Sequence, residues 1–242
     1  MPRGQPDYGA YQTKRVTATL ADMGDLAVRL GSIVEYDRRG DIVALDDFED
    51  TILKWSLLSS PGGSAVLDST VAKSGSQSVK IISGNVIGRL SNIHKSFIFQ
   101  GAPQIGIEVS LCDPSNGADF YFHISHWDGV NGQRAQVWYD RSVGLLYAEY
   151  PVIGAWTPIA NIGILRRNEH LFYPIKLVVD FSTGFYKRLL FSDTEHDLST
   201  IAIPPIGLAG ADYLSAQIMC VSAIAAEQTL WVDNFILTQN EP

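Results

Sequence analysis

The residues best suited to ligand chemistry lie in the aromatic window 120–140, FYFHISHWDGVNGQRAQVWYD. Aromatic rings stack on sugar faces, and neighbouring His, Asn, Gln and Asp side chains can hydrogen-bond to sugar hydroxyls. Side chains alternate between the two faces of a strand, so Tyr121 and His123 share one face, and Phe120 and Phe122 share the other. If the Phe face is core, the opposite face is open. The window then predicts a saccharide site made of Tyr121, His123, Trp127, Trp138 and Tyr139; the alternative is that these rings fill an edge of the core.

The densest acidic cluster is formed by Asp46, Asp47, Glu49 and Asp50 in the segment LDDFED. Calcium is bound by six to eight hard oxygen ligands, and carboxylates are the residue type that it needs. A structural calcium ion is therefore one interpretation, and no other cofactor is expected. The alternative interpretation is a solvated turn whose carboxylates accept hydrogen bonds from backbone N–H groups.

Other catalytic and metal-binding patterns are not found in the sequence. The five histidines are dispersed, and His123 and His126, three residues apart, would lie on opposite faces of a strand, which argues against a zinc site. No Ser-His-Asp order, glycine-rich phosphate loop or Cys-x-x-Cys motif is present. Cys112 and Cys220 both lie in apolar runs, which favours two buried free thiols over a single disulfide.

The elements that must position these residues are β-strands. From residue 45 to 240, apolar strand-like runs recur every 10–15 residues, separated by Gly, Pro, Asn, Ser and Asp. This spacing predicts an all-β fold, an antiparallel jelly-roll β-sandwich. The predicted strands cover 64–69, 77–83, 95–100, 104–112, 119–127, 134–140, 145–150, 156–160, 216–224 and 229–238, together with a hairpin over 172–191.

The hairpin 172–191, FYPIKLVVDFSTGFYKRLLF, shows the most regular alternation in the chain. Two strands on either side of a Ser-Thr-Gly turn are expected to have one buried face. The inward side chains would be Ile175, Leu177, Val179, Phe185 and Leu189. The side chains expected to face solvent or another subunit are Lys176, Lys187 and Arg188.

Residues 1–44 are predicted to form a separate unit for assembly, before a sandwich over 45–242. An extended arm (1–15) precedes a short α-helix over 19–31, which Thr19 can cap, and two short strands follow at 33–37 and 41–48. The helix packs either on its own domain or on a neighbouring subunit. The residues expected to make these contacts are Tyr8, Tyr11, Leu20, Met23, Leu26 and Leu30.

Composition excludes several classes of function. The net charge of −8 and the scattered basic residues argue against nucleic-acid binding, which needs a clustered basic surface. No apolar run is long enough for a membrane-spanning helix, and the polar N-terminus does not look like a signal peptide. An apolar content of 46% indicates a globular protein.

Several segments resemble the concanavalin A-like superfamily of lectins, laminin-G-like domains and carbohydrate-binding modules. They are LDDFEDTILKW (45–55), SGSQSVKI (74–81), the hairpin 172–191 and LWVDNFILT (230–238). The resemblance implies a jelly roll, a sugar site on its concave sheet, and a structural calcium near the first and last strands. Asp233 and Asn234 would then join Asp46, Asp47 and Glu49 as ligands. The paired acids of the superfamily's glycosidases are not found on one strand here, so no enzymatic activity is expected.

Two functional hypotheses follow. The first is a structural protein of a virion, such as a capsid-decoration, head-fibre or tail subunit of a phage, assembled in the host cytoplasm. It would form a homo-oligomer, such as a trimer, and dock on a capsid or tail protein through its N-terminal arm. The alternative is a carbohydrate-binding module or lectin, acting alone or extracellularly, that binds a glycan through the aromatic window.

Overall fold

All the regular structure is β-strand in the residues that the computed structural model describes, which are 40–113, 118–166, 171–207 and 211–242. No helix in this part of the chain is long and apolar enough to cross a membrane. The strands are β1 (Asp41–Asp46), β2 (Ser56–Ser59), β3 (Ser64–Asp68), β4 (Ser78–Ile82), β5 (Leu90–Phe97), β6 (Gln104–Cys112), β7 (Ala118–Asp128), β8 (Gly132–Asp140), β9 (Leu145–Glu149), β10 (Trp156–Asn161), β11 (Tyr173–Asp180), β12 (Phe185–Phe191), β13 (Thr194–Asp197), β14 (Pro205–Ile206), β15 (Asp212–Ser222) and β16 (Thr229–Gln239).

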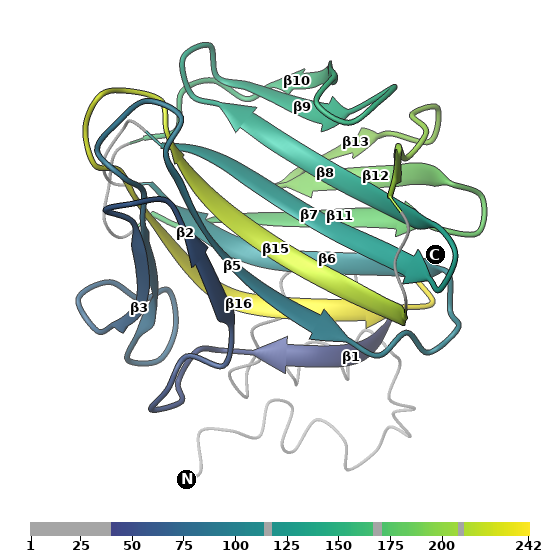
Figure 1. Ribbon diagram of the computed structural model, residues 1–242, viewed down its shortest axis with the longest axis horizontal. Coiled ribbons are helices and arrows are strands. Elements are labelled where there is room, and N and C mark those ends of the chain that lie inside the picture. Colours follow the sequence, from purple (N-terminus) through teal and green to yellow (C-terminus); the bar gives the residue numbers. More distant parts are fainter. Residues whose placement is uncertain (1–39, 114–117, 167–170, 208–210) are drawn as a thin grey trace, which may run out of the picture. The chain divides into compact units, whose positions relative to one another are not determined.

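These strands form two antiparallel sheets that pack face to face as a sandwich (Figure 1). Sheet A has the order β13-β12-β11-β6-β16-β4-β3, and β1 also pairs with β16. Sheet B has the order β10-β9-β8-β7-β15-β5-β2, and the short β14 pairs with β8. The all-β sandwich predicted from the strand spacing is confirmed.

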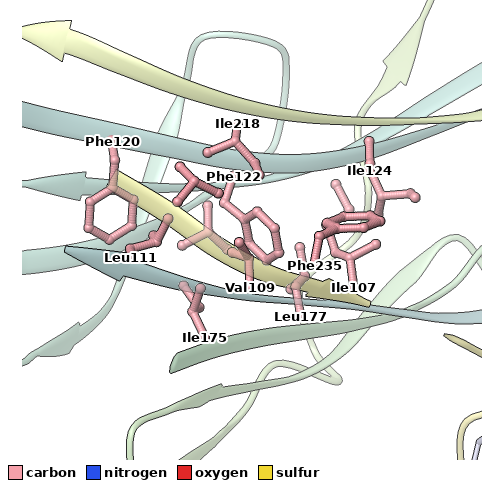
Figure 2. Close-up of a cluster of buried hydrophobic side chains, with 14 of the residues drawn as sticks. Ile107, Val109, Leu111, Phe120, Phe122, Ile124, Ile175, Leu177, Ile218 and Phe235 are labelled. Atoms are coloured by element: carbon pink, nitrogen blue, oxygen red, sulfur yellow. The ribbon is translucent and has the colours of Figure 1, made fainter. Parts of the chain in front are cut away.

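The core lies between the two sheets, because each sheet turns one apolar face inward. Figure 2 shows Ile107, Val109 and Leu111 of β6 opposite Phe120, Phe122 and Ile124 of β7. All six are almost completely buried, as period-two alternation requires for a strand with one face in the core. Burial of each such side chain stabilises the fold by about 1.5–3 kcal/mol. The two inner faces therefore also determine which side chains of β7 and β8 point outward.

The hairpin β11–β12 differs from its prediction in two places. Val178 pairs with Arg188 but Val179 pairs with Tyr186, so Lys187 is an extra residue in a β-bulge. Beyond the bulge the alternation is reversed: Phe185, predicted to point inward, is exposed, and its neighbour Tyr186 is buried. Ile175, Leu177, Val179 and Leu189 are buried as predicted. Lys176 is buried rather than solvent-facing, because it forms an ion pair with Glu241 at 2.7 Å.

The strand predicted over 41–48 forms β1, which pairs with β16. Residues 41–44 are therefore part of sheet A rather than of a separate N-terminal unit. The predicted arm, the helix over 19–31 and the strand over 33–37 lie outside the described residues, as do Tyr8, Tyr11, Leu20, Met23, Leu26 and Leu30. Cys112 and Cys220 are both buried and are not joined in a disulfide, as predicted.

Candidate functional site

Four aromatic rings from four neighbouring strands gather on the outer face of sheet B. Tyr121 of β7 pairs with Trp138 of β8, which pairs with Tyr147 of β9. The Trp138 ring is stacked on both neighbours, with ring centroids 5.8 Å from Tyr121 and 5.0 Å from Tyr147. Trp156 of β10 lies 5.3 Å from Trp138. All four side chains are half-buried, and we call this set the aromatic platform.

Trp138 is held in its orientation by Asp119 at the start of β7. The indole Nε1 donates to Asp119 Oδ2 at 3.3 Å, and Asp119 Oδ1 accepts from the backbone N–H of Arg141 at 3.1 Å. Burial raises the pKa of Asp119 to about 6, against the opposing effect of these hydrogen bonds. The face of the indole ring remains directed toward the other rings of the platform.

Next to the platform, the same face is hollowed by a cavity of about 490 Å³. Its floor is polar and comes from strands β5, β7, β8 and β15, which lie side by side in sheet B. The floor residues are His94, His123, Ser125, Arg134, Ser215 and Gln217. Gln217 pairs with His94 on one side and with His123 on the other, so the two imidazoles flank its side chain. The rim consists of Leu58, Trp127, Ile153 and Ile206. We call the floor and the rim together the hollow.

His123 is a neutral imidazole in the floor of the hollow. Only 5% of the residue is exposed. Burial lowers its pKa to about 3, and the positive charge of Arg134 acts in the same direction. Among the described residues, neither His123 Nδ1 nor His94 Nδ1 has a hydrogen-bond partner, although both atoms are buried. Buried polar atoms are normally paired, so these two nitrogens are exceptions within the floor of the hollow.

Arg134 and Glu149 form the one ion pair described in the hollow and its immediate wall. Arg134 Nε donates to Glu149 Oε2 at 2.8 Å, and Nη2 donates to Oε1 at 2.5 Å. Glu149 Oε1 also accepts from the backbone N–H of Gly154 at 2.8 Å. The carboxylate therefore ties the segment 150–155, which carries Ile153, to the floor of the hollow.

The structure brings four of the five predicted saccharide-site residues onto one face. Tyr121 and Trp138 belong to the platform, while His123 and Trp127 line the hollow. The prediction that Tyr139 belongs to the site is wrong, because Tyr139 is completely buried and its ring stacks on Phe120 with centroids 5.0 Å apart. Consecutive residues of a strand point to opposite faces, so Trp138 and Tyr139 could not share one surface.

The sequence prediction missed several residues of the same face. They are Tyr147, Trp156, Tyr213, His94, Arg134 and Gln217. The alternation within a predicted strand indicates on which face Tyr147 or Trp156 lies. It does not indicate which strands are neighbours. Only the pairing of β9 and β10 beside β8 shows that these two rings lie next to Trp138.

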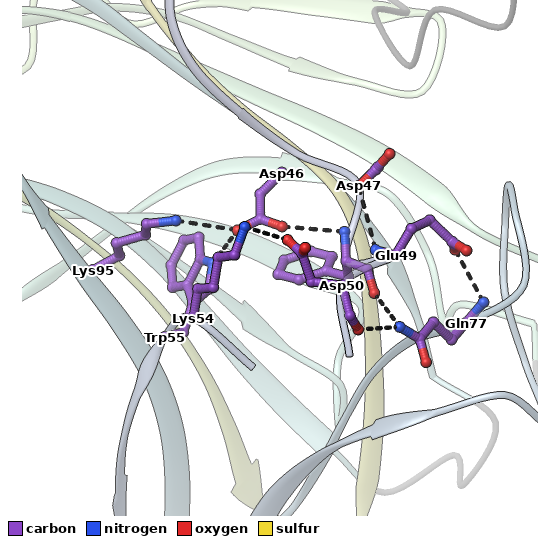
Figure 3. Close-up of polar contacts among 9 residues, drawn as sticks. Asp46, Asp47, Glu49, Asp50, Lys54, Trp55, Gln77 and Lys95 are labelled. Atoms are coloured by element: carbon purple, nitrogen blue, oxygen red, sulfur yellow. Dashed lines mark hydrogen bonds and ion pairs between the residues drawn. The ribbon is translucent and has the colours of Figure 1, made fainter. Parts of the chain in front are cut away.

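The predicted calcium residues are engaged in hydrogen bonds and ion pairs (Figure 3). Asp46 accepts from Trp55 Nε1 at 2.9 Å and pairs with Lys95 Nζ at 3.1 Å. Glu49 accepts from the backbone N–H groups of Ser76 and Gln77 at 2.9 and 3.0 Å.

Asp47 and Asp233, two further calcium candidates, also accept backbone hydrogen bonds. Asp47 accepts from the backbone N–H of Glu49, and Asp233 from those of Lys73 and Ser74. Within the described ranges no group of three or more His, Cys, Asp or Glu side chains is arranged to hold a metal ion. These contacts fit the alternative of carboxylates that bind backbone N–H groups, and calcium stays a prediction.

No protein-family model matches the sequence, and no curated protein matches it. The fold does resemble solved structures. An endo-β-1,4-glucuronan lyase from the fungus Trichoderma reesei superimposes with a TM-score of 0.60 at 10% identity, covering 82% of this chain and 96% of that one. A protein of unknown function with a galectin-like fold from Bacillus subtilis gives 0.54 at 10% identity, covering 83% and 96%.

A third solved structure is a conserved carbohydrate esterase from the Shiga toxin-encoding bacteriophage phi24B. It gives a TM-score of 0.53 at 12% identity and covers 77% of this chain and 90% of that one. At these identities the likeness concerns the fold. This chain is thus similar to β-sandwich proteins that include a galectin-like domain and two proteins named for their action on carbohydrates.

Proposed function

We propose that this protein binds a carbohydrate chain along the outer face of sheet B. The observation that carries the proposal is the juxtaposition of the aromatic platform with the hollow, whose floor contains the buried, unpartnered nitrogens of His94 and His123. Aromatic surface that contacts the apolar side of a sugar and polar atoms that bind its hydroxyls are the two components that recognition of a sugar requires.

The length of this face suits an extended ligand. Tyr121 and Trp127 lie on the same side of β7 six residues apart, which corresponds to about 20 Å along the strand. Trp127 stacks on Tyr213 with ring centroids 4.6 Å apart. Aromatic pairs therefore lie at both ends, with the polar floor of His123 and Ser125 between them, and an oligosaccharide of several units matches this order.

The proposal is limited to binding without catalysis. Glu149, the acid bonded to the floor residue Arg134, is also held by the N–H of Gly154, which suits a structural role for its carboxylate. The names of two similar structures, a glucuronan lyase and a carbohydrate esterase, support carbohydrates as the ligand class to test first.

The second candidate, a virion subunit, concerns residues 1–31 and stays a prediction. Docking on a capsid or tail protein, and a trimeric state, would be supported by particle binding that is lost when residues 1–31 are removed. One of the similar structures belongs to a bacteriophage, and this observation makes phage particles the first ones to test. A glycan-binding virion subunit would satisfy both proposals.

A glycan array followed by calorimetry tests carbohydrate binding. Wild-type protein should bind at least one glycan with a dissociation constant below millimolar, and Trp138→Ala should weaken it tenfold or more, the loss of about 1.4 kcal/mol. Phe185→Ala is the control, because Phe185 is an exposed aromatic residue of sheet A. The absence of any binding at millimolar ligand, or equal loss in both variants, would contradict the proposal.

A further inference from the structure

Three of the four rim residues of the hollow are aliphatic, and these three come from separate elements. Leu58 lies on β2, Ile153 lies in the segment 150–155, and Ile206 lies on β14. Leu58 is 60% exposed and Ile153 is 47% exposed. Large aliphatic side chains that converge on one cavity from different elements offer an apolar surface to a ligand.

This rim is held in place by specific contacts. Glu149 Oε1 accepts from the N–H of Gly154, next to Ile153, at 2.8 Å. On the other side, a Cβ atom at Gly132 would come within 2.6 Å of Ile206 Cγ1 and 2.8 Å of the Trp127 ring. Only glycine lets these two side chains lie so close to β8. The position of this part of the rim therefore depends on the residue at 132.

An unsubstituted sugar would make few favourable contacts with an aliphatic rim. Its hydroxyl groups need polar partners, and burying a hydroxyl against Leu58 or Ile153 without one costs about 1–3 kcal/mol. A free carboxylate fits no better, because it would compete with Glu149 for the guanidinium of Arg134. A small, uncharged, partly apolar substituent matches both the aliphatic rim and the polar floor.

We propose that the hollow takes a sugar unit that carries a short ester group, either an O-acetyl ester or the methyl ester of a uronic acid. This inference rests on the proposed function and names its ligand class. The methyl group of the ester would lie against Leu58 and Ile153. The carbonyl oxygen would accept hydrogen bonds from the floor, where the amide of Gln217 and the hydroxyls of Ser125 and Ser215 are donors.

Two matched pairs of ligands test the inference by calorimetry on the full chain. The first pair is O-acetylated xylan oligosaccharides and the same preparation after mild alkaline deacetylation. The second is methyl-esterified oligogalacturonides and the same preparation after saponification. The esterified form of at least one pair should bind about fourfold more tightly for each methyl group buried, the equivalent of about 0.8 kcal/mol. A preference in one pair alone identifies which ester is recognised.

Variants separate the rim from the rest of the face. Leu58→Ser and Ile153→Ser should each reduce the preference for the ester and leave the affinity for the de-esterified ligand within twofold. Val66→Ser is the control, because Val66 is an aliphatic residue on β3 of sheet A that is about as exposed as Ile153. The Val66→Ser variant should have the same preference for the esterified ligand as the wild type.

The outcomes distinguish this inference from the proposed function. Equal or tighter binding of the de-esterified form in both pairs overturns the ester inference. If Trp138→Ala still weakens that binding, the proposed function stands. If none of the four preparations and no glycan on the array binds, both are overturned.

Discussion

Glu149 on β9 holds Arg134 on β8 through two hydrogen bonds, of 2.8 Å from Nε to Oε2 and 2.5 Å from Nη2 to Oε1. The Glu149 side chain is 1% exposed and that of Arg134 is 25% exposed. The same carboxylate accepts the N–H of Gly154. One buried acid thus connects the floor of the hollow to the segment that supplies part of its rim.

Replacing this acid should destabilise the protein and loosen the rim. Glu149→Gln removes the charge that balances Arg134, and we expect a loss of about 1–3 kcal/mol, typical for hydrogen bonds to charged groups. Urea denaturation measures this loss in the free energy of unfolding. The exposed pair of His126 and Asp212 gives the control, because Asp212→Asn should change stability by less than about 1 kcal/mol. Equal small effects of both substitutions would contradict the connecting role of Glu149.

Glycine at position 132 should be required for binding. In Gly132→Ala the new Cβ would meet Ile206 and Trp127 at 2.6 and 2.8 Å, so both side chains must move. We expect affinity for the glycan to fall several-fold, measured by calorimetry, with a stability loss of about 1–3 kcal/mol from overpacking. Gly207→Ala is the matched control, because a Cβ atom there meets nothing within 4 Å. Unchanged affinity in Gly132→Ala would show that the positions of these two side chains do not matter for binding.

His123 should make the protein less stable in mild acid. Its pKa is about 3 in the folded state, against about 6.5 in an unfolded chain, so below pH 6.5 a proton binds to the unfolded state alone. Stability is then lost as the pH falls from about 6.5 toward 3, by about 2 kcal/mol at pH 5.

The measurement is urea denaturation of the wild type and of His123→Gln at pH 7.5 and pH 5.0. Burial raises the pKa of Asp119 and of Asp233 to about 6, and these two acids stabilise the folded state as the pH falls. Because both proteins contain them, their effect cancels in the difference between wild type and variant. The same pH dependence in both proteins would be evidence against a buried, neutral His123.

A buried ion cluster near the C-terminus should contribute to the stability of sheet A. Glu241 is completely buried and pairs with Lys176 at 2.7 Å and with Arg188 at 3.2 Å. We expect Glu241→Gln to cost about 3 kcal/mol, because it leaves buried positive charge less well compensated. Asp50→Asn removes the exposed pair with Lys54 and should cost under about 1 kcal/mol. Chemical denaturation compares the two, and a loss for Glu241→Gln no larger than that of the control would refute the expectation.

The strand positions could be predicted because a strand with one buried face needs an apolar residue at every second position. The prediction over 104–112 coincides with β6, and those over 119–127 and 134–140 lie within β7 and β8. The short strands β2, β13 and β14 were missed, since SLLS, TEHD and PI contain too few residues to show an alternation.

The bulge in β12 shows where local pattern fails. The alternation in FYKRLLF gives no sign that Lys187 is an extra residue, so the inward prediction for Phe185 is wrong. The burial of Lys176 was missed for a related reason, because its partner Glu241 is distant in the sequence. Both depend on contacts that form only when β11, β12 and the C-terminal residues meet.

By itself, the sequence determined that the chain forms a two-sheet sandwich and that Tyr121 and His123 face away from its core. Only the tertiary structure placed Trp138 beside Tyr121 and Tyr147, and Gln217 between His94 and His123. The physical reason is that alternation reports the burial of one strand, whereas the order and register of strands depend on pairing between distant segments. The candidate site exists only because this pairing brings side chains from distant segments together on one face of sheet B.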